Sequence, residues 1–365
     1  MISGDGAFLT NLPGTGTPAV AFAALIDTGS DLVWRQCQPC ANCYSQSSGD
    51  PVFNPTRSST FRRLPCSADL CSDLPRSSCS STSSTCRYVY AYGDSSYTSG
   101  ELVSDTLTMP DLSGRPVAVP NLAFGCGYDN ANNFAGADGV IGLGQGPLSL
   151  LSQLSIPRFS YCLQSMEDDP SRTSPLYLGA GASLSTSTSS SSSSSSTTAV
   201  QSTPLVGNPK SSGTFYYVTI EGISVGGTAA AIPSDAFYSG VIFDSGTTLT
   251  YLDQSVYNRV LDLFRSKISL IPIQHSRTGL DLCYAGSPSN LPSLIFHFRG
   301  GADMVLPIAN YFIAVEDNLV CLALAASKEP NDISIIGNIQ QQNFHILYDL
   351  QEQRLSFVPA VCDSL

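Results

Sequence analysis

The chain has 365 residues, a formal net charge of -12 and a pI of about 4.5, and only 13% of its residues are charged. An acidic chain without a lysine or arginine cluster lacks the basic footprint that a phosphate backbone requires, so nucleic acid is excluded as a partner. The sequence holds no run of about 18 apolar residues, so we expect no membrane-spanning helix.

Short runs of β-branched and aromatic residues between Gly/Pro/Ser turns predict a mostly-β protein. In the first half the expected strands are 19–27, 87–92, 100–108, 122–124 and 139–143, and a short helix that begins with proline is expected over 147–154. In the second half the expected strands are 215–225, 241–244, 249–252, 294–298, 319–325, 344–349 and 354–358. Asp253 is expected to cap a helix whose apolar stripe is Val256, Val260, Leu261, Leu263 and Phe264.

A tract of serine and threonine separates the two halves of the chain. Residues 183–198 are almost entirely of these two types and include eight consecutive serines. Such a segment cannot bury apolar surface, so we expect a disordered loop. The predicted organisation is an N-terminal lobe over 1–178, the loop over 179–200 and a C-terminal lobe over 201–365.

The twelve cysteines predict a disulfide framework and an oxidising compartment, because their number is even and seven lie between Cys37 and Cys86. The spacing Cys37-x2-Cys40-x2-Cys43 also suggests a metal or iron–sulfur site, but no fourth ligand follows at ferredoxin spacing. Residues 1–10 carry no basic or apolar region typical of a signal peptide, so we expect a mature or shortened form.

Two short segments nearly repeat one another, LIDTGS over residues 25–30 and IFDSGT over residues 242–247. Each is an apolar run, which predicts a buried strand, followed by Asp, a glycine that permits a tight turn, and hydroxyl residues that can donate hydrogen bonds to a carboxylate. The repeat therefore predicts two carboxylates, Asp27 and Asp244, at the ends of two strands. Such a pair can share one proton, activate a water and hydrolyse an amide bond without a cofactor.

Other hydrolase classes fit the sequence less well. The three histidines do not cluster in the sequence and no Gly-x-Ser-x-Gly motif is present, which argues against a serine hydrolase. The even cysteine count argues against a cysteine protease. A carboxylate pair also suits a glycosidase, but that alternative leaves the repeated Asp-(Ser/Thr)-Gly unexplained.

The chain resembles the pepsin-type aspartic proteases and, within them, the plant nepenthesin type. The two Asp motifs match the active-site motifs of that family, the single tryptophan Trp34 follows the first motif as expected, and Tyr92-Gly93 matches the flap. The segments DGVIG over 138–142 and IIG over 335–337 match the strands that pass beneath each Asp, and the cysteine-rich insert after Trp34 resembles the nepenthesin insert.

This resemblance implies a bilobal, mostly-β acid protease fold with two pseudo-symmetric, barrel-like lobes and a central cleft. It implies an aspartic endopeptidase that works at acidic pH, with no metal or cofactor, on protein or peptide substrates. A monomer located in the extracellular space (apoplast) or the vacuole is expected. The implied site consists of catalytic Asp27 and Asp244, supported by Gly29, Ser30, Trp34, Tyr92, Gly246 and Thr247.

The serious alternative is a catalytically silent binder on the same fold, similar to the plant inhibitors of microbial xylanases. Some of those proteins have lost active-site features, whereas here both Asp residues, their hydroxyl neighbours and Tyr92 are present. An acid-pH protease assay with and without pepstatin separates the two functions.

The resemblance also implies a disulfide pairing and shows one departure. The implied pairs are Cys37–Cys40, Cys43–Cys126, Cys66–Cys86, Cys71–Cys79, Cys162–Cys362 and Cys283–Cys321. The step Pro13-Gly14 departs from the regular strand that the family has before its first motif, so we expect an irregular strand there.

Overall fold

The computed structural model describes residues 9–46, 49, 51–131, 134–165, 174–184, 199–207, 213–233, 235–275, 279–286, 290–329, 332–362 and 365. The chain divides into two compact units, which we call the first unit (residues 7–156) and the second unit (residues 157–365). The first unit ends at residue 156, whereas the sequence predicted a boundary at residue 178. The difference arises because strands β10 (Arg158–Cys162) and β11 (Leu176–Leu178) belong to a sheet of the second unit. Most of the serine tract, over 185–198, lies outside the described residues.

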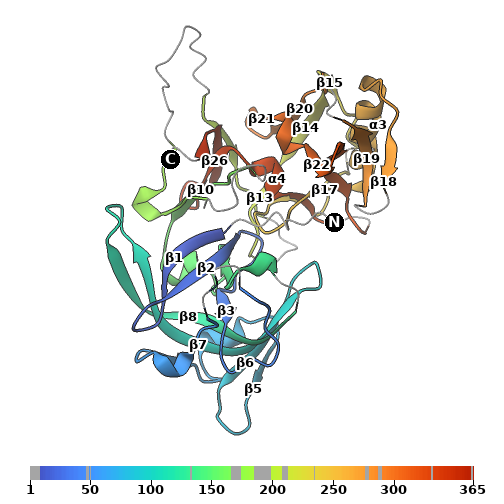
Figure 1. The fold of residues 1–365 in the computed structure, drawn as a ribbon. Coiled ribbons are helices and arrows are strands. Elements are labelled where there is room, and N and C mark those ends of the chain that lie inside the picture. The colour runs from blue at the N-terminus through green and yellow to red at the C-terminus, as the bar shows by residue number, and fades with distance from the viewer. Residues whose placement is uncertain are drawn as a thin grey trace. The chain divides into compact units, whose positions relative to one another are not determined.

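A nine-stranded sheet dominates the first unit (Figure 1). Its order is β1 (Leu9–Thr15), β2 (Val20–Asp27), β9 (Gly139–Gly142), β3 (Trp34–Gln36), β8 (Pro116–Ala131), β7 (Tyr97–Pro110), β6 (Cys86–Ala91) and β5 (Ser77–Cys79), with β4 (Arg62–Arg63) paired to β7. The helical turns are η1 (Pro55–Arg57), α1 (Asp69–Ser72), η2 (Phe134–Gly136) and α2 (Leu150–Gln153). The expected helix over 147–154 is therefore present but shorter, and its cap is Ser149, whose hydroxyl accepts from the Ser152 amide.

Strand β1 is irregular where the sequence departs from the family. Its register with β2 shifts between Leu12 and Thr15. Gly14 has φ of 134°, and a Cβ at this position would lie 1.9 Å from the Val20 carbonyl oxygen. Only glycine fits this close approach, so the Pro13-Gly14 step is accommodated as a local bulge.

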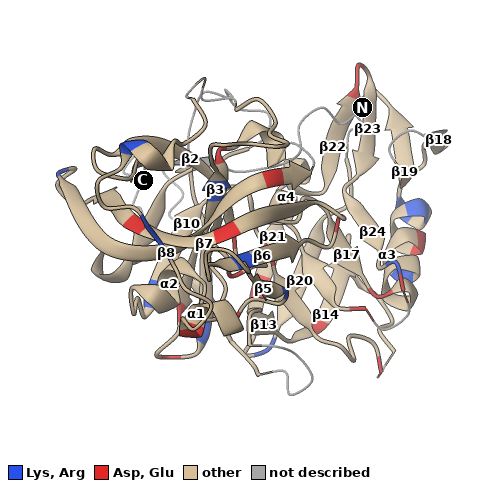
Figure 2. Ribbon diagram, turned by 90° about the horizontal axis from the view of Figure 1, so that it is seen from below, with Lys and Arg blue, Asp and Glu red and all other residues tan. Residues whose placement is uncertain are grey.

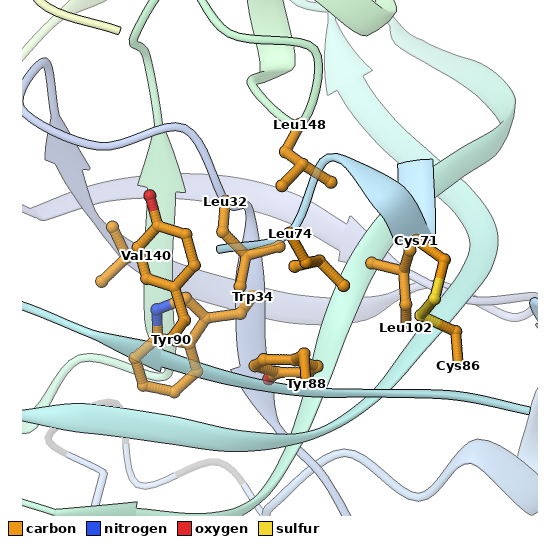
Figure 3. Packing of buried hydrophobic residues seen from close by; sticks show 10 residues of the cluster. All are labelled: Leu32, Trp34, Cys71, Leu74, Cys86, Tyr88, Tyr90, Leu102, Val140 and Leu148. Atoms are coloured by element: carbon orange, nitrogen blue, oxygen red, sulfur yellow. A yellow bond between two sulfur atoms is a disulfide. The ribbon is translucent and has the colours of Figure 1, made fainter. Parts of the chain in front are cut away.

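The core of the first unit forms around Trp34. The side chains of Leu32, Tyr88, Tyr90, Leu102 and Val140 pack with it, together with the Cys71–Cys86 disulfide (Figure 3). Trp34 is fully buried. The strands that supply this cluster are β3, β6, β7 and β9, and β9 pairs with β2, which ends at Asp27.

The described residues of the second unit form four sheets. One sheet has the order β11, β10, β26 (Phe344–Asp349), β27 (Arg354–Pro359) and β12 (Gln201–Pro204), and a second has the order β13 (Tyr217–Val218), β16 (Val241–Phe243), β25 (Ser334–Ile336), β17 (Thr250–Leu252) and β24 (Leu324–Ala326). The third sheet has the order β15 (Thr228–Ala229), β14 (Ile220–Val225), β20 (Leu294–Phe298) and β21 (Ala302–Leu306). The fourth has the order β18 (Ile273–His275), β19 (Leu280–Ala285), β23 (Leu319–Leu322) and β22 (Phe312–Glu316). The helices are η3 (Gly179–Gly181), α3 (Gln254–Lys267), η4 (Ile308–Asn310) and α4 (Asn338–Gln341). The expected strand over 215–225 is divided between β13 and β14.

Helix α3 follows the sequence prediction closely. The Asp253 side chain accepts from the Ser255 amide and caps the helix, and the buried face contains Val256, Val260, Leu261 and Phe264, with Tyr257 in addition. Leu263, which was also expected on this face, is only half-buried. The opposite face carries charged residues, which colour α3 in Figure 2. None of the described helices is long and apolar enough to span a membrane.

All twelve cysteines are paired, and two of the six expected pairs, Cys162–Cys362 and Cys283–Cys321, are confirmed. The other four expected pairs, Cys37–Cys40, Cys43–Cys126, Cys66–Cys86 and Cys71–Cys79, are wrong. The observed pairs are Cys37–Cys126, Cys40–Cys43, Cys66–Cys79 and Cys71–Cys86.

Each observed disulfide joins cysteines of similar burial. Cys37, Cys126, Cys71 and Cys86 are buried, Cys40 and Cys43 are half-exposed, and Cys66 and Cys79 lie nearer the surface. The amide of Cys37 donates to the Gly127 carbonyl at 2.9 Å, which brings the Cα atoms of Cys37 and Cys126 to 5.3 Å. Because Cys37, Cys40 and Cys43 are all oxidised, their thiolates are not available as metal ligands.

Candidate active site

Asp27 lies at the end of β2 in the first unit and is 7% exposed. The Gly29 amide donates to its Oδ1 at 2.8 Å, and the Ser30 hydroxyl donates to its Oδ2. Two neighbouring residues of the same turn therefore hold the two oxygens of one carboxylate. Charge-assisted hydrogen bonds of this kind fix the orientation of the carboxylate group.

Asp244 lies directly after β16 in the second unit and is 8% exposed. The Gly246 amide donates to its Oδ1 at 2.8 Å, and the Thr247 hydroxyl donates to its Oδ2 at 2.6 Å. Each unit thus holds its Asp by the amide two residues later and the hydroxyl three residues later. The repeated sequence motif therefore folds into the same local geometry in both units.

A strand that runs parallel to each Asp strand ends at a glycine (β9) or just before one (β25). In the first unit β9 pairs with β2 and places Gly142 opposite Asp27, and in the second unit β25 pairs in parallel with β16. A Cβ on Gly142 would lie 2.2 Å from the Asp31 carbonyl oxygen, and one on Gly337 would lie 2.2 Å from the Leu249 carbonyl oxygen. Only glycine allows the turn after each Asp to pass this close to its neighbouring strand.

The predicted flap tyrosine contacts the predicted tryptophan. Tyr92 lies just after β6, and the indole Nε1 of Trp34 donates to its hydroxyl oxygen at 2.7 Å. Burial, followed by the neighbouring Tyr90 and the charge of Asp27, raises the pKa of Tyr92 well above its ordinary value. Tyr92 is therefore a neutral phenol whose own proton remains available for donation to a further acceptor.

Phe134 packs against Trp34 and Tyr92, and the sequence did not identify it as a site residue. Its ring centroid lies 4.9 Å from that of Trp34 and 5.5 Å from that of Tyr92, both in edge-on geometry. Phe134 and Ala135 have φ of 39° and 52°, in the left-handed region that non-glycine residues rarely adopt. Such a conformation persists where the surrounding packing imposes it, here at the ring that packs against Tyr92.

Two groups of polar residues behind the Asp turns were also missed. In the first unit the Asp31 amide donates to the Tyr90 hydroxyl at 3.2 Å and the Gly146 amide donates to Asp31 Oδ1 at 2.8 Å. In the second unit the side chain of Asn338 donates to the Ser245 carbonyl at 3.1 Å, and that of Gln341 to the Asp244 carbonyl at 3.2 Å. The polar run NIQQQ over 338–342, directly after the Ile-Ile-Gly motif, is the sequence signal that could have found the second group.

The predicted site residues therefore form three groups. Asp27, Gly29 and Ser30 lie together in the first unit, and so do Trp34 and Tyr92. Asp244, Gly246 and Thr247 lie together in the second unit. Within each unit the carboxylate is buried and accepts one backbone amide and one hydroxyl hydrogen bond from its own turn.

The chain is similar to proteins of known type along nearly its whole length. Residues 8–180 match the family model "Xylanase inhibitor N-terminal" and residues 215–359 match "Xylanase inhibitor C-terminal". Aspartic proteinase nepenthesin-1 of Nepenthes gracilis is 43% identical over 372 residues, which cover 99% of this chain and 79% of that protein. Aspartyl protease family protein 2 of Arabidopsis thaliana is 39% identical over 373 residues, which cover 98% of this chain and 72% of that protein.

Solved structures show the same fold at lower identity. The crystal structure of edgp superposes with a TM-score of 0.76 at 20% identity and covers 98% of this chain and 92% of its own. Basic 7S globulin from soybean superposes with a TM-score of 0.73, also at 20% identity, and covers 99% of this chain and 93% of its own.

Proposed function

Because the chain belongs to the plant pepsin-like aspartic proteinases of the nepenthesin type, we propose that Asp27 and Asp244 are its catalytic pair. The protein is an aspartic endopeptidase with the mostly-β, bilobal pepsin-like fold that the sequence predicted. The observation that carries the residue assignment is the matched geometry of the two carboxylates. Each one ends a buried strand and accepts one amide and one hydroxyl hydrogen bond.

In the proposed reaction the two carboxylates share one proton and bind one water. The ionised Asp removes a proton from the water as its oxygen attacks the amide carbonyl carbon, and the protonated Asp donates to the carbonyl oxygen. The C–N bond then breaks, and the leaving nitrogen takes up the proton that the water lost. Because close carboxylates share a single proton, the reaction requires acidic conditions.

The supporting residues have separate proposed roles. Ser30 and Thr247 orient the two carboxylates, and the backbone amides of Gly29 and Gly246 hold their other oxygens. Tyr92 closes over an extended substrate peptide and is fixed by Trp34, and its free phenolic proton suits a hydrogen bond to the peptide backbone. Protein or peptide chains are therefore the substrate class.

The test is an acid-pH assay of peptide cleavage with the full chain. Asp27→Asn and Asp244→Asn should each abolish turnover while far-UV circular dichroism and the melting temperature stay near those of the parent. Pepstatin should inhibit the parent. Cleavage that persists in either Asn variant would refute the pair.

A second function, a silent binder, has one supporting observation, since the matching family models are described as xylanase inhibitor domains. The intact hydroxyl and amide donors around both Asp residues favour the enzyme. Absence of pepstatin-sensitive cleavage in a folded protein, together with tight binding to a xylanase, would favour the binder.

The disulfides bear on where the enzyme acts. Six disulfides form and persist in an oxidising environment, which supports an extracellular or vacuolar location. We propose that the enzyme works there as a monomer and without a cofactor.

A further inference from the structure

Ser224, His297 and Asp303 form a hydrogen-bonded series on the second unit, although Ser224 lies 73 residues before His297 in the sequence. The Ser224 hydroxyl oxygen lies 2.8 Å from Nε2 of His297, and Nδ1 of His297 lies 2.6 Å from Oδ1 of Asp303. Ser224 is on β14, His297 on β20 and Asp303 on β21, which are consecutive strands of one sheet (Figure 1). This is the order of contacts, nucleophile to base to carboxylate, that activates serine in hydrolases.

The strand alternation explains why the three side chains meet. Ile223 and Val225 of β14, Phe296 and Phe298 of β20, and Ala302 and Met304 of β21 are buried, so the residues between them point to the other face of the sheet. Ser224, His297 and Asp303 are among those outward residues and are half-exposed or exposed.

The pairing register then sets the distances. His297 is the direct cross-strand partner of Asp303, and on its other side it faces Gly222. A Cβ on Gly222 would lie 3.3 Å from Cδ2 of His297, so the glycine leaves room for the imidazole to lean over β14 toward Ser224. The register of β14 also shifts between Ile220 and Gly222, and such bulges re-aim side chains next to functional sites.

We propose that Ser224 is an activated nucleophile that accepts an acyl group from an electrophilic ester. His297 is the general base and Asp303 holds the imidazole in the required tautomer. Ser224 Oγ attacks the ester carbonyl carbon while its proton passes to Nε2 of His297. The ester C–O bond then breaks, the proton moves from His297 to the departing alkoxide, and the products are acyl-Ser224 and a free alcohol.

The surroundings indicate the kind of acyl group. Ile295 is the cross-strand partner of both Ser224 and Val305. The apolar side chains of Ile295 and Val305 therefore lie on the outward face beside the serine. Val305 is 54% exposed, so it offers apolar surface that a ligand can cover. A short aliphatic acyl chain fits this position better than a charged one.

The proposal is limited to one covalent transfer per chain. Nucleophile, base and orienting carboxylate suffice for acylation, whereas rapid turnover also requires preorganised donors for the oxyanion. The reaction uses none of the residues assigned to peptide cleavage, so it stands independently of that function.

The experiment treats the full chain with p-nitrophenyl butyrate at pH 8 in the presence of pepstatin. We expect release of about one equivalent of p-nitrophenolate, and peptide mapping should locate the butyryl group on Ser224. Ser224→Ala should abolish the burst, and His297→Gln should slow it at least tenfold, since a general base typically contributes about 10²–10⁴-fold. Asp303→Asn should also slow the burst.

Ser202→Ala is the matched control, because Ser202 is a half-buried strand serine whose hydroxyl contacts the Ser356 hydroxyl at 2.8 Å rather than a histidine. It should react like the parent. Peptidase activity at acidic pH should be unchanged in all four variants, which shows that they are folded. Butyrylation spread over other residues, or a burst of equal rate in His297→Gln, would overturn the proposal.

Discussion

At the scale of single residues, the hydroxyl hydrogen bonds to Asp27 and Asp244 should have a measurable effect on kcat. Ser30 donates to Asp27 Oδ2 and Thr247 to Asp244 Oδ2. Hydrogen bonds to charged groups contribute about 1.5–3 kcal/mol. Because this energy also orients the proposed catalytic carboxylates, we expect Ser30→Ala and Thr247→Val to lower kcat by roughly ten- to a hundredfold.

Thr247→Ser is the control for that experiment because it keeps the donor and removes only a methyl group. It should retain most of the parent kcat in the same acid-pH peptide assay. If Thr247→Val were as active as Thr247→Ser, the hydroxyl would have no orienting role.

His345 is a buried titratable residue outside the proposed site, so we expect it to affect stability rather than catalysis. Its Nε2 lies 3.0 Å from the Ser160 hydroxyl, its Nδ1 has no hydrogen-bond partner among the described residues, and burial lowers its pKa. The unfolded chain then binds a proton more readily than the folded chain does. Stability is full above the ordinary histidine pKa and falls as the pH drops below it.

We expect His345→Gln to reduce this loss, because glutamine can still reach Ser160 but does not titrate. The measurement is the melting temperature of parent and variant between pH 7.5 and pH 4, where the parent should fall more steeply. Ser160→Ala removes the partner but no titrating group, so its pH slope should match the parent. Parallel slopes for parent and His345→Gln would contradict the assignment.

At the scale of elements, two disulfides of nearly equal loop length allow a clean comparison. Cys66–Cys79 closes a separation of 13 residues and Cys71–Cys86 one of 15, so the chain-entropy contributions are nearly equal, at about 3 kcal/mol each. They differ in burial, since Cys71 and Cys86 pack within the core around Trp34 (Figure 3).

Replacing Cys71 and Cys86 by Ala should therefore destabilise the protein by about 1–3 kcal/mol more than replacing Cys66 and Cys79, because it also leaves a cavity. Denaturant unfolding of the two double variants measures the difference. Non-reducing peptide maps of the parent provide the control, since they should recover both pairs. Equal losses would mean that the core does not rely on the buried sulfur atoms.

The elements themselves were largely predictable from local patterns. The apolar runs that end in Asp27 and Asp244 became β2 and β16, and the cap and stripe after Asp253 became α3. The sequence did not predict four of the disulfide pairs or the Ser224–His297 contact, because both depend on which residues become neighbours in the folded chain. Disulfide pairing follows burial, and Ser224 lies 73 residues from His297, so only the β14–β20 register brings them together. No local pattern specifies such a contact.

At the scale of the whole molecule, each unit is stabilised internally. Four disulfides close within residues 7–156 and two within residues 157–365. Each unit also has its own sheets, and each contributes one carboxylate to the proposed pair. Peptide cleavage should therefore be lost as soon as either unit unfolds, even while the other unit remains folded.

Calorimetry can test this independence, because units that unfold separately give more than one transition and a van't Hoff enthalpy below the calorimetric enthalpy. Removing Cys283–Cys321 by double Ala substitution should lower only one transition, and removing Cys66–Cys79 should lower only the other. Activity after brief heating should follow whichever transition is lower in each variant. If either double variant shifted both transitions equally, the two units would unfold as one cooperative body, and the loss of cleavage could not be assigned to a single lobe.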